Sequence, residues 1–285
     1  MPDLDEIFAA QSDQHAVTLA VRMAGNLLFR VPNSVREAKL LLAHVMGKPL
    51  HDLGMADMTT EAMDRLAVLC EARNSGTPMS HLLGARDFWN HRFQVTPDVL
   101  DPRPETEILV EAALQVPFAS VLDLGTGSGC ILLSLLAERG GATGVGADVS
   151  KAALDVARRN AADIGVAQRC TLVLSDWFTA IEGSFDLILS NPPYIALEEM
   201  AGLSAELSFE PRMALTDEGD GLSCYRRICD GVDPYLNANG WLMVEIGPTQ
   251  GDSVAAMMQA VGLTNIRIQP DLDGRDRVVL GQKAL

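Results

Sequence analysis

Hydrophobic positions follow two different spacings along the 285-residue chain. Up to about residue 84, apolar residues recur three and four positions apart, as amphipathic helices require, notably in 17–29 and 59–73. Ser34 and Glu37 have the spacing of a helix-capping box ahead of a third helical stretch. After residue 120, short apolar runs alternate with longer helical patterns, which predicts an α/β fold with a mostly parallel sheet covered on both faces.

The apolar runs of this second region predict seven strands with helices between most of them. We expect strands at 120–124, 143–147, 170–175, 185–190, 240–246, 264–269 and 277–281. Helices are expected at 129–139, 150–164, 221–236 and 249–261.

Between the two regions, Phe88, Trp89 and Phe93 stand among turn-forming residues, as in a short β-hairpin. The following Pro102–Glu107 should be extended before a helix that starts near Thr106. We therefore expect three parts: an N-terminal helical domain at 1–84, a hairpin linker at 85–105 and an α/β domain at 106–285.

Composition narrows the class of protein. The net charge of −16 argues against the general attraction to phosphate that dominates nucleic-acid binding. Five cysteines without a C-x-x-C pair argue against a disulfide framework, and no apolar run is long enough to span a membrane. A cytoplasmic protein is expected. No histidine follows His91, so the later domain contains neither a histidine base nor a histidine metal site, and no metal is expected.

The most informative segment is Asn191-Pro192-Pro193-Tyr194, directly after the apolar run 185–190. Prolines donate no backbone hydrogen bond, so they end the strand and fix the residues around them at its carboxyl end, where α/β sheets bind ligands. The Asn191 and proline carbonyl oxygens can accept hydrogen bonds from one planar NH2 group, and an aromatic ring can stack on it. The segment therefore indicates a site for an amide or an exocyclic amine; the alternative is a simple strand-ending turn.

A glycine-rich turn follows the first predicted strand, at Gly125-Thr126-Gly127-Ser128-Gly129. Glycines allow a ligand to approach the backbone at a helix N-terminus, although dinucleotide sites share this feature. Asp148 ends the second strand, where its carboxylate can bind ribose hydroxyls or cap the next helix. Trp177 follows the third strand, either against an adenine ring or as a core residue.

The glycine turn, the acid after the second strand and the NPPY segment after the fourth resemble the class I S-adenosylmethionine-dependent methyltransferases. A narrower resemblance covers nearly the whole chain: it is similar to the peptide chain release factor glutamine methyltransferases (HemK/PrmC type). The segments that carry it include Gly76-Thr77-Pro78, Leu82-Leu83-Gly84, Pro102 to Glu107, Asp123 to Gly129, Asp186 to Ile195, Glu210-Pro211, Tyr225-Arg226 and Glu245-Ile246-Gly247.

This resemblance implies a Rossmann-like methyltransferase domain that methylates the side-chain amide nitrogen (N5) of the glutamine in the Gly-Gly-Gln motif of release factors. S-adenosylmethionine is the implied cofactor and S-adenosylhomocysteine the product. The implied cofactor-binding residues are Gly125, Thr126, Gly127, Ser128, Gly129, Asp148, Trp177 and Asn191. Asn191, Pro192, Pro193 and Tyr194 would bind the substrate glutamine, with Asn191, Pro192 and Tyr194 as catalytic residues.

The helical domain would help to hold the release factor, and we expect a monomer that binds neither nucleic acid nor membrane. Three alternatives remain open: a ribosomal-protein glutamine methyltransferase, an adenine-N6 DNA methyltransferase and a noncatalytic cofactor-binding regulator. The chain departs from the family pattern at Asp101 and at Met79-Ser80-His81, which bears on the packing of the linker. Glu105 either borders the active site or only favours the start of its helix.

Overall fold

The computed structural model describes residues 4–285, without the side chains of residues 4–11 and 205. The chain divides into two compact units, Met1–Gly84 and Ala85–Leu285. The hairpin expected as a linker belongs to the second unit by this division.

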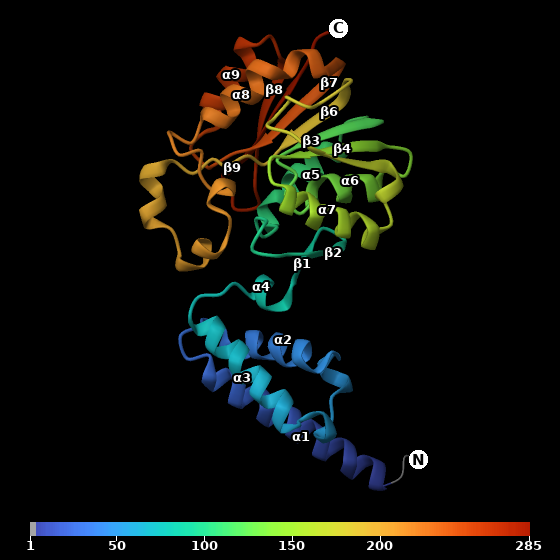
Figure 1. Ribbon diagram of the computed structural model, residues 1–285, viewed down its shortest axis with the longest axis vertical. Coiled ribbons are helices and arrows are strands. Elements are labelled where there is room, and N and C mark those ends of the chain that lie inside the picture. Colours follow the sequence, from blue (N-terminus) through green and yellow to red (C-terminus); the bar gives the residue numbers. More distant parts are fainter. Residues whose placement is uncertain (1–3) are drawn as a thin grey trace. The chain divides into compact units, whose positions relative to one another are not determined.

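The first unit is helical (Figure 1). Its elements are α1 (Leu4–Leu27), α2 (Ser34–Met46), η1 (Leu50–Asp52), η2 (Met55–Asp57), α3 (Thr60–Asn74) and α4 (Met79–Leu83). Leu28, Leu41, Leu42 and Leu66 are almost fully buried in its core. The capping box predicted from Ser34 and Glu37 is wrong. Asn33 precedes α2 with a left-handed φ of 59° and makes no side-chain cap bond, and Glu37 instead forms an ion pair with Arg73 across 2.6 Å.

The second unit contains the hairpin of β1 (Ala85–Phe88) and β2 (His91–Gln94), then η3 (Pro104–Thr106) and a seven-stranded sheet with its helices. The strands are β3 (Ser120–Leu124), β4 (Thr143–Asp148), β5 (Cys170–Leu174), β6 (Phe185–Ser190), β7 (Leu236–Glu245), β8 (Thr264–Pro270) and β9 (Asp276–Gln282). The helices are α5 (Glu107–Leu114), α6 (Cys130–Glu138), α7 (Lys151–Ile164), α8 (Ser223–Val232) and α9 (Gly251–Ala260). Shorter 3-10 turns are η4 (Ala167–Arg169), η5 (Leu197–Gly202), η6 (Ala205–Phe209), η7 (Arg212–Ala214) and η8 (Asp233–Tyr235).

The strands lie in the order β5-β4-β3-β6-β7-β9-β8, and β9 alone runs in the direction opposite to the other strands. Side chains of the central strands alternate between two apolar clusters, because successive residues of a strand point to opposite faces. Leu187 and Leu189 of β6 belong to one cluster, with α5 and α6, whereas Ile188 belongs to the other, with α8 and α9. The sheet is therefore the middle layer of three, as predicted (Figure 1).

All seven strands expected from the sequence are present. The largest difference lies before β7, where a single helix was expected over 221–236. Helix α8 ends at Val232, a short turn containing Pro234 follows, and Leu236 already pairs with Phe185 of β6. Among the described residues, no helix is both long enough and apolar enough to cross a membrane.

Candidate active site

The strand order reverses between β3 and β6, which are parallel neighbours in the middle of the sheet. The connection after β3 crosses to one side of the sheet and the connection after β6 to the other, so a crevice opens at their carboxyl ends. The glycine turn follows β3 and the segment 191–194 follows β6. The two motifs identified from the sequence therefore meet at the usual ligand position of such sheets.

A cavity of about 190 Å³ lies at this place. Its lining includes most of the predicted site residues: Gly125, Thr126, Gly127, Ser128, Asp148, Trp177, Asn191 and Pro193. Further walls come from Asp98 to Arg103, Thr106, Pro211, Met213 and Ala214. Gly129, Pro192 and Tyr194 were also predicted, but they do not line this cavity.

Three glycines shape the turn after β3, with φ values of 73° at Gly125, 55° at Gly127 and 82° at Gly129. These left-handed angles are unfavourable for residues that carry a Cβ. A Cβ on Gly125 would meet no atom within 4 Å, so this backbone borders open space in the cavity. A Cβ on Gly129 would lie 2.7 Å from Leu133 Cδ1. Gly125 therefore leaves room for a ligand, whereas Gly129, the N-cap of α6, leaves room for the Leu133 side chain of the same helix.

Asp148 holds the glycine turn from the neighbouring strand. One carboxylate oxygen accepts from the Gly127 N–H at 2.9 Å and the other from the Ser150 N–H at 2.8 Å. Ser150, not Asp148, is the N-cap of α7, since its hydroxyl accepts from the Ala153 N–H. A carboxylate offers about four acceptor positions, so Asp148 keeps acceptor capacity toward the cavity.

Asp123 is fully buried directly beneath the turn. Its Oδ2 accepts from the Thr126 hydroxyl at 2.7 Å, while Oδ1 has no hydrogen-bond partner. Burial raises the pKa of Asp123 to about 7, with Asp148 adding to the rise and the Thr126 hydrogen bond opposing it. The residue stabilises the turn from inside and does not line the cavity.

Trp177 also lines the cavity and has a left-handed φ of 51°. Ser175 supports this conformation, because its hydroxyl donates to the Trp177 carbonyl at 2.8 Å and accepts from the Ala180 N–H. The indole also packs against the apolar cluster beside α8. Trp177 therefore combines a core contact with a surface that faces the cavity.

Asn191 is fixed by a residue far away in sequence. Its Nδ2 donates to the Thr106 hydroxyl oxygen at 3.2 Å. Thr106 is almost fully buried beside Glu245, at the end of β7: burial raises the pKa of that carboxyl, and the Thr106 side chain opposes the rise. With its NH2 group bonded to Thr106, Asn191 has its carbonyl oxygen available as an acceptor in the cavity it lines.

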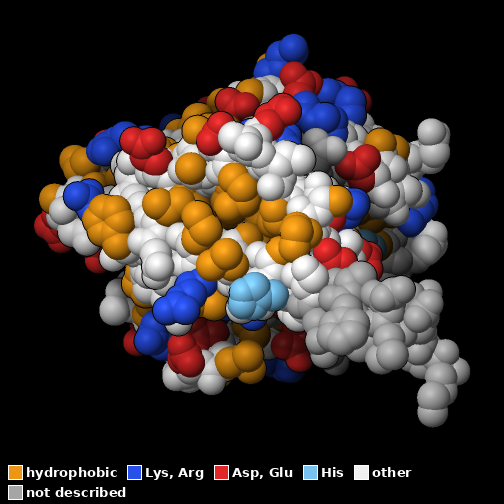
Figure 2. All heavy atoms as spheres, turned by 90° about the horizontal axis from the view of Figure 1, so that it is seen from below, with side chains coloured by type: hydrophobic (Ala, Val, Ile, Leu, Met, Phe, Trp, Pro, Cys, Tyr) orange, Lys and Arg blue, Asp and Glu red, His pale blue; other side chains and the backbone are white. Residues whose placement is uncertain are grey.

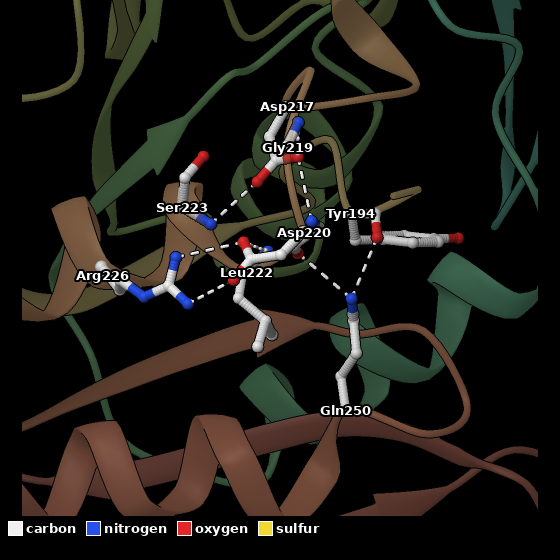
Figure 3. Close-up of polar contacts among 9 residues, drawn as sticks. Tyr194, Asp217, Gly219, Asp220, Leu222, Ser223, Arg226 and Gln250 are labelled. Carbon is white, nitrogen blue, oxygen red and sulfur yellow. Dashed lines mark hydrogen bonds and ion pairs between the residues drawn. The ribbon is translucent and has the colours of Figure 1, made fainter. Parts of the chain in front are cut away.

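Tyr194 is held at its backbone by Gln250, whose Nε2 donates to the Tyr194 carbonyl at 2.9 Å and to the Gly221 carbonyl at 3.1 Å. Gln250 Oε1 accepts from the Gly247 N–H and the Tyr225 hydroxyl, so both ends of this carboxamide are bonded. The Tyr194 ring points away from the turn that Gly221 belongs to (Figure 3). The segment 191–194 is thus anchored at its first and last residues.

That turn is built around Asp217, which accepts from the backbone N–H groups of Gly219, Gly221 and Ser223 (Figure 3). Gly221 has a φ of 76°, and a Cβ on it would lie 2.4 Å from the Tyr194 carbonyl oxygen. Only glycine therefore allows this close approach.

A buried charge cluster joins two walls of the cavity. Arg103 pairs with Glu210, and the Asp101 backbone N–H also donates to Glu210 at 3.3 Å. Asp101, the departure noted in the sequence, is buried and lies 3.7 Å from Arg103. Burial raises the pKa of Glu210, and Arg103 opposes that rise.

Glu105, in contrast, is exposed and does not line the cavity; Thr106 is the neighbour that reaches Asn191.

No group of histidine, cysteine, aspartate and glutamate side chains in the described part of the chain is arranged to hold a metal ion.

Comparison with known proteins identifies the family of this chain. Residues 20–84 match the PrmC N-terminal domain, and residues 98–222 match the methyltransferase small domain. The chain is 51% identical over 253 residues to the release factor glutamine methyltransferase of Cereibacter sphaeroides, an alignment that covers 87% of this chain and 91% of that protein. The chain belongs to the release factor glutamine methyltransferase family.

A second member of this family, from Rhodospirillum rubrum, is 42% identical over 87% of this chain and 78% of its own length. The crystal structure of a methyltransferase from Pyrococcus furiosus has the same fold, with a TM-score of 0.52 at 14% identity over 68% of this chain and 89% of that one. The resemblance stated from the sequence is confirmed by the family match.

Several residues of the site were not predicted from the sequence: Thr106, Asn160, Glu210, Glu245 and Gln250. Thr106 was expected as a helix start and within a family motif, and Glu210 and Glu245 only as parts of family motifs. Asn160 is fully buried on α7 and donates to the Ser128 carbonyl at 2.8 Å. Its position on the apolar side of an amphipathic helix is the one signal that could have singled it out.

Proposed function

We propose that this chain transfers a methyl group from S-adenosylmethionine to the N5 amide nitrogen of the glutamine in the Gly-Gly-Gln motif of peptide chain release factors. Membership of the family supports the reaction. The observation that carries the proposal is the Asn191 carboxamide, which donates to Thr106 and lines the same cavity as the glycine turn. An amide acceptor and the recess beside the glycine turn thus share one crevice.

The residues around the glycine turn suit the proposed cofactor. The open space beside Gly125 admits a ligand to the backbone, and the free acceptor capacity of Asp148 suits ribose hydroxyls. Trp177 offers a flat surface for the adenine ring. Gly125 to Ser128, Asp148, Trp177 and Asn191 would hold the cofactor, which when bound supplies an activated methyl group; Gly129 would act by setting the start of α6.

The segment 191–194 would bind the acceptor glutamine. The Asn191 side-chain oxygen and the Pro192 carbonyl accept hydrogen bonds from the substrate NH2 group, which orients the nitrogen toward the methyl group. These bonds strengthen as positive charge develops on that nitrogen during transfer. Pro193 keeps the segment rigid, and the Tyr194 ring stacks on the planar carboxamide.

The chain needs no strong base before transfer, because the amide proton becomes acidic only once the methyl group has joined the nitrogen. Burial raises the pKa of Tyr194 to about 12, with Glu245 adding to the rise. The phenol therefore stays neutral near pH 7 and contributes its ring rather than a base. No histidine lies in the sequence beyond His91.

The N-terminal unit would recognise the release factor. Leu19, Met23 and Leu27 recur every four residues on α1 and are 51%, 51% and 46% exposed, so they form an apolar stripe on the outside of a helix. Phe29 just beyond the helix is 73% exposed. Figure 2 shows a face on which hydrophobic side chains gather among charged ones. Such patches mark protein contacts more often than an ordinary surface does.

This role gives the proposed domain plan, with recognition at 1–84, a hairpin linker at 85–105 and transfer at 106–285.

The test is a transfer assay with S-adenosylmethionine that carries a labelled methyl group. Purified release factor, the same factor with its Gly-Gly-Gln glutamine replaced by alanine, ribosomal proteins and duplex DNA serve as acceptors. Label on the intact release factor alone supports the proposal. Label on adenine or on ribosomal proteins in its place overturns it. The proposed protein is a cytoplasmic monomer. Its mass in solution, measured in the same buffer, tests whether it is a monomer.

A further inference from the structure

Glu245 is a buried acid that the proposed reaction does not yet use. It ends β7, where Val244 pairs with Ser190, so it comes level with Asn191 on the neighbouring strand. The residue is 1% exposed, and its Oε2 has no hydrogen-bond partner. An unpaired buried carboxylate oxygen is costly, so its retention beside the acceptor site calls for a role.

The Thr106 hydroxyl connects this acid to Asn191. A hydroxyl has one proton to donate and two lone pairs to accept with. The Thr106 side chain opposes the rise in the pKa of Glu245, as a hydrogen-bond donor does. A charged carboxylate can only accept, so we assign the single proton of Thr106 to Glu245. The Thr106 oxygen can then only accept from Asn191, in agreement with the 3.2 Å contact to Nδ2.

We propose that Glu245 is a positioning residue for methyl transfer: acting through Thr106, its carboxylate holds the Asn191 carboxamide with its oxygen, not its NH2 group, toward the acceptor amide. This inference rests on the proposed function for its effect on catalysis. The orientation of Asn191 itself is a property of the chain without substrate.

Protonation of Glu245 reverses the direction of these bonds. A neutral carboxyl can donate to Thr106, and Thr106 can then donate to Asn191, which favours the flipped carboxamide. The Asn191 NH2 group then faces the substrate NH2 group, and two donors cannot bond. Transfer therefore requires the charged form of Glu245 and falls as the pH falls.

The surroundings of Glu245 set where this happens. Burial raises its pKa to about 7, with Glu105 adding to the rise and Thr106, Arg277 and Arg103 opposing it. Burial raises the pKa of Tyr194 and of Cys130 to about 12 and that of Tyr225 well above its ordinary value, and the Glu245 charge adds to each rise. All three groups stay neutral at pH 7.

The direct test follows the side-chain NH2 signals of Asn191 by NMR in the complete, 15N-labelled chain between pH 5.5 and 8.5, without substrate. The signals are assigned by their loss in Asn191→Ala. Wild type and Thr106→Ser are expected to show a shift with a midpoint near 7, set by Glu245. Glu245→Gln and Thr106→Val are expected to show none. An unchanged titration in Glu245→Gln, or no titration in wild type, overturns the inference.

Activity gives the second readout. At pH 8, Glu245→Gln is expected to lower kcat by about 10- to 100-fold, the equivalent of one hydrogen bond to a charged group. The KM for S-adenosylmethionine should stay within about 3-fold of wild type, a difference below 1 kcal/mol. The fall of kcat at low pH, the acid limb of its pH profile, should disappear in this variant. Glu182→Gln, an equal change at an exposed loop residue, is the matched control and should keep the wild-type profile.

The outcomes separate the two claims. If wild type methylates the release factor but Glu245→Gln keeps both its rate and its acid limb, the inference fails and the proposed function stands. If wild type methylates nothing, the proposed function fails, while the NMR titration still decides the orientation of Asn191.

Discussion

The glycine turn after β3 and the segment 191–194 after β6 border the same cavity, but different kinds of contact hold them in place. The turn is held mainly through its backbone groups: three glycines are left-handed, the Gly125 and Thr126 N–H groups bond the Ala147 carbonyl of the next strand, and the Gly127 N–H bonds the Asp148 carboxylate. The segment 191–194 is held by side chains from elsewhere, with Thr106 on Asn191 and Gln250 on Tyr194.

This difference separates two tasks. The cofactor recess depends on a backbone path that its glycines allow and that Asp148 and Asn160 support by bonds to Gly127 and Ser128. The acceptor site depends on the direction of one carboxamide and one ring, which single hydrogen bonds can turn. Substitutions near the acceptor site should therefore reduce transfer while the cofactor still binds, and substitutions in the turn should weaken cofactor binding as well as transfer.

Asn191→Ala should have the largest effect on transfer. It removes the acceptor oxygen whose bond strengthens as charge develops, so kcat should fall by about 100- to 1,000-fold. Because the half-buried side chain makes one hydrogen bond, to Thr106, the melting temperature should change little. Rates and thermal melts of both proteins check this. If Asn191→Ala keeps the kcat of the wild type, Asn191 has no part in the mechanism.

Gln250→Ala tests the other anchor. It leaves the Tyr194 and Gly221 carbonyls and the Gly247 N–H without their partner, which should lower the free energy of unfolding by about 3 kcal/mol. The KM for the release factor should rise by about 10-fold, because a freed Tyr194 positions the substrate less well.

The matched control for this anchor is Gln259→Ala, an exposed residue of the same helix, which should behave as wild type. Cofactor affinity should also be unaffected by Gln250→Ala. A loss of cofactor binding equal to the loss of transfer would show that the two regions are not separable as described.

Gly129→Ala should damage the glycine turn. The added Cβ meets a left-handed φ of 82° and lies 2.7 Å from Leu133 Cδ1, so a loss of about 3 kcal/mol in the free energy of unfolding is expected, with weaker cofactor binding. Gly183→Ala has the same φ of 82° but open space, and should lose only about 1 kcal/mol. Chemical denaturation of both variants checks the difference. Equal losses would contradict the packing role of Gly129.

The smallest predicted effect concerns Asp123. Its folded-state pKa of about 7 lies above the ordinary value of 3.8, so protonation stabilises the fold. This contribution is complete below about pH 4 and is lost as the pH rises through about 7. Asp123→Asn should therefore melt at a higher temperature than wild type at pH 8, and the gap should close toward pH 5. A lower melting temperature at pH 8 would contradict the account.

The same difference explains what could be predicted from the sequence. The strands, the glycine turn and the position of Asn191 follow from local patterns, and all lie where expected. The supporting residues do not, because Thr106 and Gln250 are 85 and 56 residues from the groups they bond. The false capping box has the same cause: Glu37 pairs with Arg73, 36 residues away, rather than with its own helix end. Local spacing carries no information about such partners.

The most direct measurement is mass spectrometry of the release factor after incubation with S-adenosylmethionine and either the wild-type chain or Asn191→Ala. The account predicts one added methyl group on the Gly-Gly-Gln glutamine with wild type, and at most traces with a variant that still folds. A methyl group on another residue, or equal methylation by both proteins, would contradict it.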